Sequence, residues 1–306
     1  MNKFGYISRP CPSCNETSTT NAVIQSKKNA ENFDFDSLIP HWNGFFKEKI
    51  IFSYTRCAHC GLLYAPIFFS MEQLNKLYSQ MPPNMDVVPL SALQKTQKKY
   101  FSHLATSSKL TNGYIEIGPD IGIFTSYCVS NGDFNKYWLF EPNRAVEKQL
   151  TDIMKNKDFS IINNMVGFEQ VPNQTASVAV MIQVLDHLLD PVKTLKELRH
   201  KLTPDGKLLL VTHNEQSLLS KVCGWKWPAF CLQHPQIYNP SSIKKLLYQA
   251  GYQVDSCVRS KNHFELEFLV KHLLWIFGID IKKFPTIFKK TIGLKLGNII
   301  TLASKI

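Results

Sequence analysis

The sequence predicts an α/β protein built on a doubly wound, mostly parallel seven-stranded sheet, with a small N-terminal zinc ribbon. From Gly113 onward, short apolar runs alternate with stretches of helical periodicity, which is typical of strands joined by crossover helices. The run "SVAVMIQVL" is apolar almost throughout, as a strand covered on both faces should be. Two Cys-x-x-Cys pairs precede this region, at the spacing of a metal-binding ribbon.

The 306 residues suffice for one large domain and a smaller module. We expect the zinc ribbon at residues 1–66, a helical linker or lid at 67–112, and the main domain at 113–306. Within the main domain, residues 262–297 form a basic insertion that we expect to be helical.

The main domain divides into strands and helices in a regular order. The expected strands are residues 113–118, 136–142, 159–163, 177–185, 207–214, 252–260 and 297–306. The expected helices are residues 121–132, 143–156, 191–202 and 242–250, preceded in the linker by 70–79 and 90–108. "TPDG" at residues 203–206 is expected to be the turn before the fifth strand.

Four N-terminal cysteines form two pairs, Cys11 with Cys14 and Cys57 with Cys60. Each pair lets two thiolates converge from one tight turn, and two such pairs complete a tetrahedral sulfur shell that suits Zn²⁺. Since four thiolates close the shell, we expect a structural ion and no catalysis. The alternatives are coincidental pairs or a redox pair. The scattered thiols are expected in the core or a pocket: Cys128, Cys223, Cys231 and Cys257.

The bulk composition limits the class of protein. Hydrophobic residues make up 44% and charged residues 19%, which indicates a folded chain. The net charge of +11 and pI of about 9.2 favour anionic partners, namely nucleic acid, nucleotide-linked substrates or an acidic membrane surface. A basic enzyme without a polyanionic partner is the alternative. Without a signal-like or membrane-spanning run, we expect a cytoplasmic protein with reduced thiols.

The stretch "GYIEIGPDIGIF" places a glycine-bearing turn directly after the first strand. Glu116 ends the strand, Gly118 allows a sharp turn, and Gly122 allows close approach of the backbone. Glu141 ends the next strand, 25 residues after Glu116. A carboxylate at that place can accept two ribose hydroxyls, as in dinucleotide-binding folds. The sequence therefore predicts a nucleoside-binding site here.

Several motifs together resemble class I S-adenosylmethionine-dependent methyltransferases, whose fold is Rossmann-like. They are "YIEIGPDIGIF", "WLFEPN", "VLDHLLDPVKTLKELRHKLTPDGKLLLVTHN" and "IKKLLYQAGYQV". The N-terminal "CPSC", "RCAHCGLLY" and "LNKLY" are similar to a bacterial subgroup with an N-terminal zinc ribbon, often linked to sugar, glycan or natural-product tailoring. The resemblance implies that the last strand pairs antiparallel at the sheet edge.

The resemblance also implies roles for matching positions. Glu116, Gly118 and Gly122 would line the methionine end of the cofactor, Glu141 would hold the ribose, and Gln183 would face the sulfonium. The implied cofactor-binding set is Glu116, Gly118, Asp120, Gly122, Glu141, Pro142, Asn143, Asn164, Val166 and Gln183.

The chain departs from the family pattern at two places. Asp120, after Pro119, stands where the family has its second glycine, and Ser177 stands where an acid is frequent. Asp tolerates unusual backbone angles better than most residues, so we expect a competent cofactor turn. A weakened site is the alternative.

The segment after the fifth strand is rich in aromatic residues and is expected to cover the substrate. Its candidate substrate-binding residues are Trp225, Trp227, Phe230 and Tyr238. The transfer to a hydroxyl or an enolisable carbon needs a base, and His187 and His234 are the candidates. For each histidine the alternative is a structural role in a turn.

The insertion interleaves apolar residues with lysines. The basic side chains are Lys282, Lys283, Lys289, Lys290 and Lys295. Such a segment could contact the inner face of an anionic membrane or a lipid-linked substrate, although a helical cover on the domain explains the pattern more simply.

Three functions fit the sequence. The first is a methyltransferase that modifies a small polar acceptor, such as a sugar on a nucleotide or glycan carrier. The second is an RNA methyltransferase, which the charge and the ribbon favour but the lack of a dense basic stripe in the ribbon disfavours. The third is a catalytically degenerate scaffold, suggested by Asp120.

Overall fold

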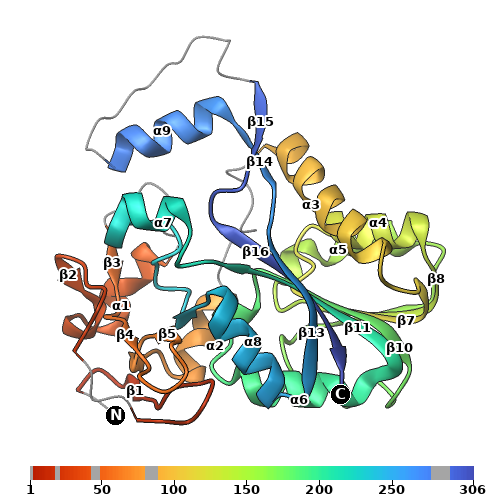
Figure 1. Cartoon of the computed structure of the whole chain (residues 1–306), viewed down its shortest axis with the longest axis horizontal. Coiled ribbons are helices and arrows are strands. Elements are labelled where there is room, and N and C mark those ends of the chain that lie inside the picture. The colour runs from red at the N-terminus through yellow and green to blue at the C-terminus, as the bar shows by residue number, and fades with distance from the viewer. Residues whose placement is uncertain (1–2, 18–20, 43–48, 80–88, 277–289) are drawn as a thin grey trace.

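A computed structural model of the chain describes residues 3–17, 21–42, 49–79, 89–276 and 290–306. Its central element is a seven-stranded sheet in the order β13-β16-β11-β10-β7-β8-β9 (Figure 1). The strands are β7 (Thr111–Ile117), β8 (Asp133–Phe140), β9 (Phe159–Ile162), β10 (Ala176–Ile182), β11 (Leu202–His213), β13 (Tyr252–Arg259) and β16 (Asn298–Lys305). The predicted α/β fold is confirmed.

The directions of the strands set the edge at which a ligand can bind. β7, β8 and β9 pair in parallel, and so do β10 and β11. β16 runs antiparallel, as expected, but it pairs with both β11 and β13 and is second from the edge. The edge strand is β13. The expected edge position was wrong because the returning chain enters between two strands and hydrogen-bonds to both.

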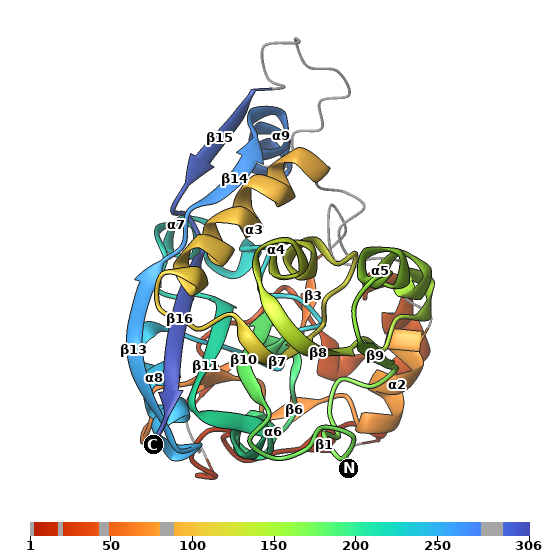
Figure 2. The ribbon, with the colours of Figure 1, turned by 90° about the vertical axis from the view of Figure 1, so that its right-hand side faces the viewer.

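Helices cover both faces of the sheet (Figure 2). One face carries α3 (Leu90–Ala105), α4 (Ile123–Asn131) and α5 (Glu147–Met154), and the other carries α6 (Pro191–Lys201) and α8 (Pro240–Gln249). Alternate strand residues supply the two cores, because successive side chains of a strand point to opposite faces. Tyr114, for example, packs into one core and Ile115 into the other.

Strand β11 begins earlier than the sequence predicts. The expected turn at residues 203–206 lies inside the strand, which already pairs with β10 at Leu202. The register then shifts, since Ala176 lies opposite Leu202 but Val178 lies opposite Lys207. The "TPDG" residues therefore form an irregularity within the strand.

The N-terminal module is built from short strands and an aromatic core. Its elements are β1 (Ile7–Ser8), β2 (Lys28–Asn29), α1 (Phe35–Leu38), β3 (Ile50–Ile51), β4 (Thr55–Arg56), β5 (Leu63–Tyr64), β6 (Ile67–Phe68) and α2 (Met71–Ser79). β5 pairs with β4 on one side and with β12 (Gln236–Ile237) on the other. Because β12 follows α7 (Leu218–Cys223) late in the chain, the module and the segment after β11 share one small sheet.

The short 3-10 turns link these elements. They are η1 (Ala30–Asn32), η2 (Ile39–His41), η3 (Arg144–Val146), η4 (Leu185–His187) and η5 (Gly224–Lys226). Of these, η4 follows β10 at the carboxyl edge of the sheet and carries one of the predicted bases, His187.

The insertion forms a small projecting unit (Figure 1). It consists of β14 (Asn262–Glu265), α9 (Leu266–Ile276) and β15 (Thr291–Leu294), and β14 pairs antiparallel with β15. The insertion thus contains the expected helix and, in addition, a two-stranded sheet, whose strand β14 packs against α3. The predicted basic residues Lys282, Lys283 and Lys289 lie outside the described residues. Among the helices that the structure describes, none is long and apolar enough to cross a membrane.

Gly122 offers a test of the turn that starts α4. Its φ is +73°, and an added Cβ would lie 2.6 Å from Ile153 Cδ1 and 2.8 Å from Leu150 Cδ2. We expect Gly122→Ala to lower the free energy of unfolding by about 2–4 kcal/mol, through left-handed strain and overpacking together. Urea unfolding measures this loss.

Gly5 provides the matched control. It has a φ of +78°, but the nearest atom to an added Cβ is the flexible Gln73 amide at 3.6 Å. Gly5→Ala should therefore cost only about 1 kcal/mol, the strain alone. Equal losses in the two variants would show that the contact with α5 is unimportant.

Candidate active site at the carboxyl edge of the sheet

The carboxyl ends of four strands meet at one edge of the sheet. Ile117 pairs with Phe140 at the ends of β7 and β8, and Ile182 pairs with Val211 near the ends of β10 and β11. Ligands of doubly wound folds bind at this edge. The side chains that follow the strand ends are therefore the candidates for chemistry.

The first turn, after β7, keeps the left-handed conformations that a glycine loop would have. Gly118 has a φ of +68° and Asp120 a φ of +50°, so Asp120 takes the left-handed conformation where the family has glycine. A Cβ on Gly118 would lie 2.5 Å from Val184 Cγ2. The turn is thus packed directly against the segment that follows β10.

Glu141 joins this turn to the end of β8. Its Oε2 accepts a hydrogen bond from the Asp120 backbone N–H at 2.9 Å, and its Oε1 accepts one from the Asn143 N–H at 2.8 Å. Burial raises the pKa of the carboxyl to about 7, although these two bonds oppose the shift. Each carboxylate oxygen retains a second lone pair, so Glu141 can still accept hydroxyl groups of a ligand.

Glu116 is a second buried acid, on the strand that leads into the turn. Its Oε2 accepts hydrogen bonds from the hydroxyls of Tyr114 and Thr125, each at 2.6 Å. Burial raises its pKa to about 7, and the nearby charge of Glu141 adds to the shift. Two desolvated carboxyl groups beside a backbone turn suit a cationic ligand, because a positive charge would favour their ionised forms. S-adenosylmethionine, which carries a sulfonium and an ammonium group, fits this requirement.

Three histidines gather beside the ends of β10 and β11. The Nε2 atoms of His187 and His234 lie 3.2 Å apart, and the rings of His213 and His234 have centroids 4.8 Å apart. The predicted bases His187 and His234 are thus brought together. His187 Nδ1 also bonds to the Tyr78 hydroxyl at 3.0 Å. The cluster therefore connects the strand ends to α2 of the N-terminal module.

The three imidazoles have different pKa values. Burial lowers the pKa of His187 well below its usual value, and the neighbouring histidines lower it further. The pKa of His213 is also lowered by burial, while Asp186 opposes the shift. For His234 burial again acts to lower the pKa, but the pairing with the Cys231 thiolate outweighs it and raises the pKa to about 9.

His213 was missed from the sequence. It is the last residue of β11, and its Nδ1 lies 2.7 Å from Oδ2 of Asp186, whose side chain is fully buried. The same oxygen accepts the His213 backbone N–H at 3.0 Å. The only signal in the sequence was the place of His213 at the end of a parallel strand.

The remaining predicted cofactor residues lie around this edge. Asn143 caps η3 with its side chain, next to Pro142, which is half-buried. Asn164 and Val166 are exposed on the segment after β9. Gln183 follows β10 with a φ of +54°, and its Nε2 lies 3.4 Å from His213 Nε2.

The predicted substrate residues differ in exposure. Trp225 is half-buried, with the Lys226 Nζ at 6.0 Å from its ring centroid. Trp227 and Phe230 pack into the aromatic core of the N-terminal module. Tyr238 is fully buried, and its hydroxyl donates to the Leu185 carbonyl at 3.4 Å. Of the four, Trp225 is therefore the side chain most open to a ligand.

The four N-terminal cysteines converge as the sequence predicts. Cys11 Sγ lies 3.5 Å from Cys60 Sγ, and Cys14 Sγ lies 3.5 Å from Cys57 Sγ. All four sulfur atoms lie within 4.8 Å of one another. Asn15 and Gly61 take positive φ angles after the two pairs, so each pair closes in a tight turn. This donor set fits a tetrahedral ion such as Zn²⁺.

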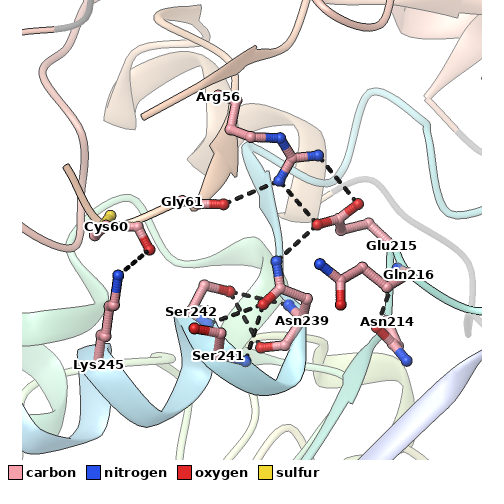
Figure 3. Close-up of polar contacts among 10 residues, drawn as sticks. All are labelled: Arg56, Cys60, Gly61, Asn214, Glu215, Gln216, Asn239, Ser241, Ser242 and Lys245. Atoms are coloured by element: carbon pink, nitrogen blue, oxygen red, sulfur yellow. Dashed lines mark hydrogen bonds and ion pairs between the residues drawn. The ribbon is translucent and has the colours of Figure 1, made fainter. Parts of the chain in front are cut away.

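A polar network fastens the N-terminal module to the segment that flanks the site (Figure 3). Arg56 of β4 makes two bonds to Glu215, at 2.9 and 3.2 Å, and Glu215 also accepts from the Asn239 side chain at 2.7 Å. Asn239 in turn caps α8. Since Glu215 follows His213 by two residues, this network fixes the chain directly after the histidine cluster.

A separate hollow of about 590 Å³ lies between the first cysteine pair and α6. Arg9, Cys11 and Lys193 are among the residues that line it, whereas the acids of the first turn and the three clustered histidines are not. The hollow is therefore not part of the candidate active site at the strand ends.

A family model described as a methyltransferase domain matches residues 91–257, more than half of the chain. The chain belongs to this methyltransferase family. It is therefore a methyl-transferring enzyme, and S-adenosylmethionine is the methyl donor that the family supports. No curated protein matches the chain.

Solved structures match this methyltransferase at low sequence identity. A complex between the Haloferax volcanii Trm112 methyltransferase activator and a methyltransferase matches at 13% identity and a TM-score of 0.51, covering 70% of this chain and 92% of that one. A methyltransferase from Bacillus halodurans matches at 14% identity and 0.48, covering 69% and 98%. One from Leishmania major matches at 13% and 0.47, covering 84% and 98%.

Glu116 gives a testable dependence of stability on pH. With a folded pKa of about 7 against a usual 4.5, the folded state holds more protons than the unfolded state between these values, so stability falls as the pH rises through this window. We expect Glu116→Gln, relative to the wild type, to gain about 1–3 kcal/mol of stability from pH 5 to pH 8. Urea unfolding across this range measures the difference.

The glutamine oxygen can still accept from Tyr114 and Thr125, so the variant removes mainly the charge. The exposed Glu147, replaced by Gln, is the control for loss of one carboxylate. If the Glu116 variant shows the same pH dependence as this control, the carboxyl group of Glu116 is not destabilised by burial.

Proposed function

We propose that the enzyme methylates a hydroxyl or an enolisable carbon of a sugar held on a nucleotide or glycan carrier. The observation that carries the proposal is the histidine cluster at the ends of β10 and β11. Acceptors of this kind lose a proton during transfer, and an imidazole of lowered pKa is a suitable proton acceptor near neutral pH.

The cofactor half of the proposal rests on the first turn. When bound, S-adenosylmethionine supplies a methyl group on a positively charged sulfur. Glu116 and Glu141 provide the negative potential that favours such a ligand, and Glu141 is placed to accept hydroxyl groups. Gly118 and Gly122 keep backbone rather than side chains at the turn, and Asp120 takes the left-handed conformation between them. The flanking wall would consist of Pro142, Asn143, Asn164, Val166 and Gln183.

The acceptor half rests on how the site is enclosed. β12 pairs with β5, so the N-terminal module and the loop after β11 form one wall, which favours a small acceptor over a nucleic-acid duplex. The half-buried Trp225 beside Lys226 combines an aromatic face with a positive charge, which suits a sugar on a phosphate-bearing carrier. Within the cluster, His187 and His234 link this wall to the strand ends.

The test begins with isothermal titration of S-adenosylmethionine. We expect binding by the wild type and at least a tenfold weaker binding by Glu141→Ala, with no change in a control variant of the exposed Glu169. The enzyme is then incubated with methyl-labelled cofactor and one of three acceptors: a nucleoside-diphosphate hexose, a lipid-linked sugar in vesicles, or tRNA. The lipid-linked sugar is included because the basic insertion would suit an anionic membrane surface. Label in the tRNA alone would contradict the sugar proposal.

We also propose that Cys11, Cys14, Cys57 and Cys60 hold one structural Zn²⁺. The convergence of four sulfur atoms supports this ion. The Lys245 side chain of α8 bonds to the Cys60 carbonyl at 3.3 Å, so the cysteine turns also touch the main domain.

Native mass spectrometry should find one zinc ion per chain, and chelation should lower the melting temperature. Cys57→Ser should lose the ion, whereas Cys257→Ser, on strand β13 and outside the group of four converging sulfur atoms, should keep it. The protein would be purified under reducing conditions with added zinc. The proposal would be contradicted if this protein contained no metal and its melting temperature did not change on chelation.

A further inference from the structure

The three clustered histidines differ in how their ring nitrogens are used. His187 is bonded at Nδ1 to the Tyr78 hydroxyl and at Nε2 to His234. His234 is bonded at Nε2 to His187, and its Nδ1 lies 2.6 Å from the Ala229 carbonyl oxygen. Both ring nitrogens of both residues therefore lie within hydrogen-bond distance of a protein partner, at 2.6 to 3.2 Å.

His213 is different. Its Nδ1 faces the Asp186 carboxylate, which can only accept when it is ionised, so Nδ1 carries the proton and Nε2 holds a lone pair. The contact of Nε2 is the Gln183 amide nitrogen at 3.4 Å, at the long limit of a hydrogen bond. The His213 side chain is 17% exposed, and His187 is also partly exposed, whereas His234 as a whole residue is only 6% exposed. His213 therefore differs from His234 in exposure and from His187 in having a ring nitrogen with only a long contact.

The place of His213 matches a role beside the cofactor turn. Gln183 and Val184 follow β10, and Val184 lies directly under Gly118 of the first turn. The Nε2 atom of His213 thus contacts the same segment that packs against the turn. Trp227 packs its ring against the imidazole, with centroids 5.9 Å apart, which limits the rotation of the His213 side chain.

We propose that His213 is the general base of methyl transfer and that Asp186 is its positioning residue. His213 Nε2 accepts the acceptor's hydroxyl or carbon-bound proton as the acceptor atom forms its bond to the methyl carbon. The methyl–sulfur bond breaks, and its electron pair stays on sulfur. Asp186 holds the resulting imidazolium through Nδ1–H. The proposal rests on the proposed function, and it assigns the pair of His187 and His234 to a supporting hydrogen-bonded chain.

The test needs no acceptor. Diethyl pyrocarbonate acylates unprotonated, accessible imidazole nitrogens, and peptide mass spectrometry locates each modification. We expect His213 to react at least fivefold faster than His187 and His234 and to be slowed by S-adenosylhomocysteine. The exposed His200 is the internal control for the reagent and should be indifferent to that ligand. A His213 that reacts no faster than its two neighbours would overturn the proposal.

Asp186 is tested by nitrogen NMR of histidine-labelled protein. In the wild type, neutral His213 should carry its proton on Nδ1, and Asp186→Asn should shift its titration to lower pH because the negative charge is lost. If the role of Asp186 were only structural, the variant would lose stability and leave this titration unchanged. A proton on Nε2 in the neutral wild type would also contradict the assignment.

His213→Asn connects the assignment to turnover. In the sugar-transfer assay it should lower kcat by about a hundredfold or more while the titrated affinity for S-adenosylhomocysteine is retained. An unchanged kcat would refute the base. If the wild type binds no cofactor and transfers no label to a sugar, the proposed function fails. The rate of diethyl pyrocarbonate modification and the nitrogen NMR titration still test the properties of His213 separately.

Discussion

The pairing of β5 with β12 is the contact on which the active-site side of this methyltransferase depends. It joins a strand near the start of the chain to one that follows β11 by more than twenty residues. Arg56 and Glu215 reinforce it at one end, and Tyr54 does so at the other by donating to the His234 carbonyl at 2.5 Å. The carboxylate of Glu215 is largely buried, so loss of Arg56 would leave a charge with little solvation. The N-terminal module therefore holds the His234-bearing loop in place.

The acids of the cofactor turn differ from Glu215, because hydroxyl and backbone N–H groups, and not an arginine, donate to their carboxyl groups. Glu116 and Glu141 are buried close to each other, and hydrogen bonds from hydroxyl and backbone N–H groups compensate their burial only in part. Such a pair lowers stability near neutral pH in the absence of a cation. A positively charged ligand would stabilise the two ionised carboxylates, and the free energy regained in this way would favour its binding. Functional sites commonly keep such unfavourable arrangements in the absence of a ligand.

Much of the fold followed from the sequence, because parallel strands buried on both faces leave long apolar runs. The turn with Gly118 and Gly122, the acid at Glu141 and the cysteine pairs were equally visible, since each depends on local spacing. The dyad of Asp186 and His213 was not visible, because the two residues stand 27 positions apart and meet only through the sheet. The loop aromatics Trp227 and Phe230 were expected to face a substrate, but a sequence cannot show that an aromatic core from the N-terminal module lies across from them.

The place of β16 has a consequence for how the chain is made. β16 comes last among the strands of the sheet, yet it lies between β11 and β13, which do not pair with each other. During synthesis both strands must wait, each with an open row of backbone donors and acceptors, until residues 298–305 leave the ribosome. The nascent protein therefore exposes the unpaired edges of β11 and β13 from the synthesis of each strand until β16 is made. A chaperone that covers these edges would reduce aggregation of the newly made protein. Slow docking of β16 between β11 and β13 would increase it.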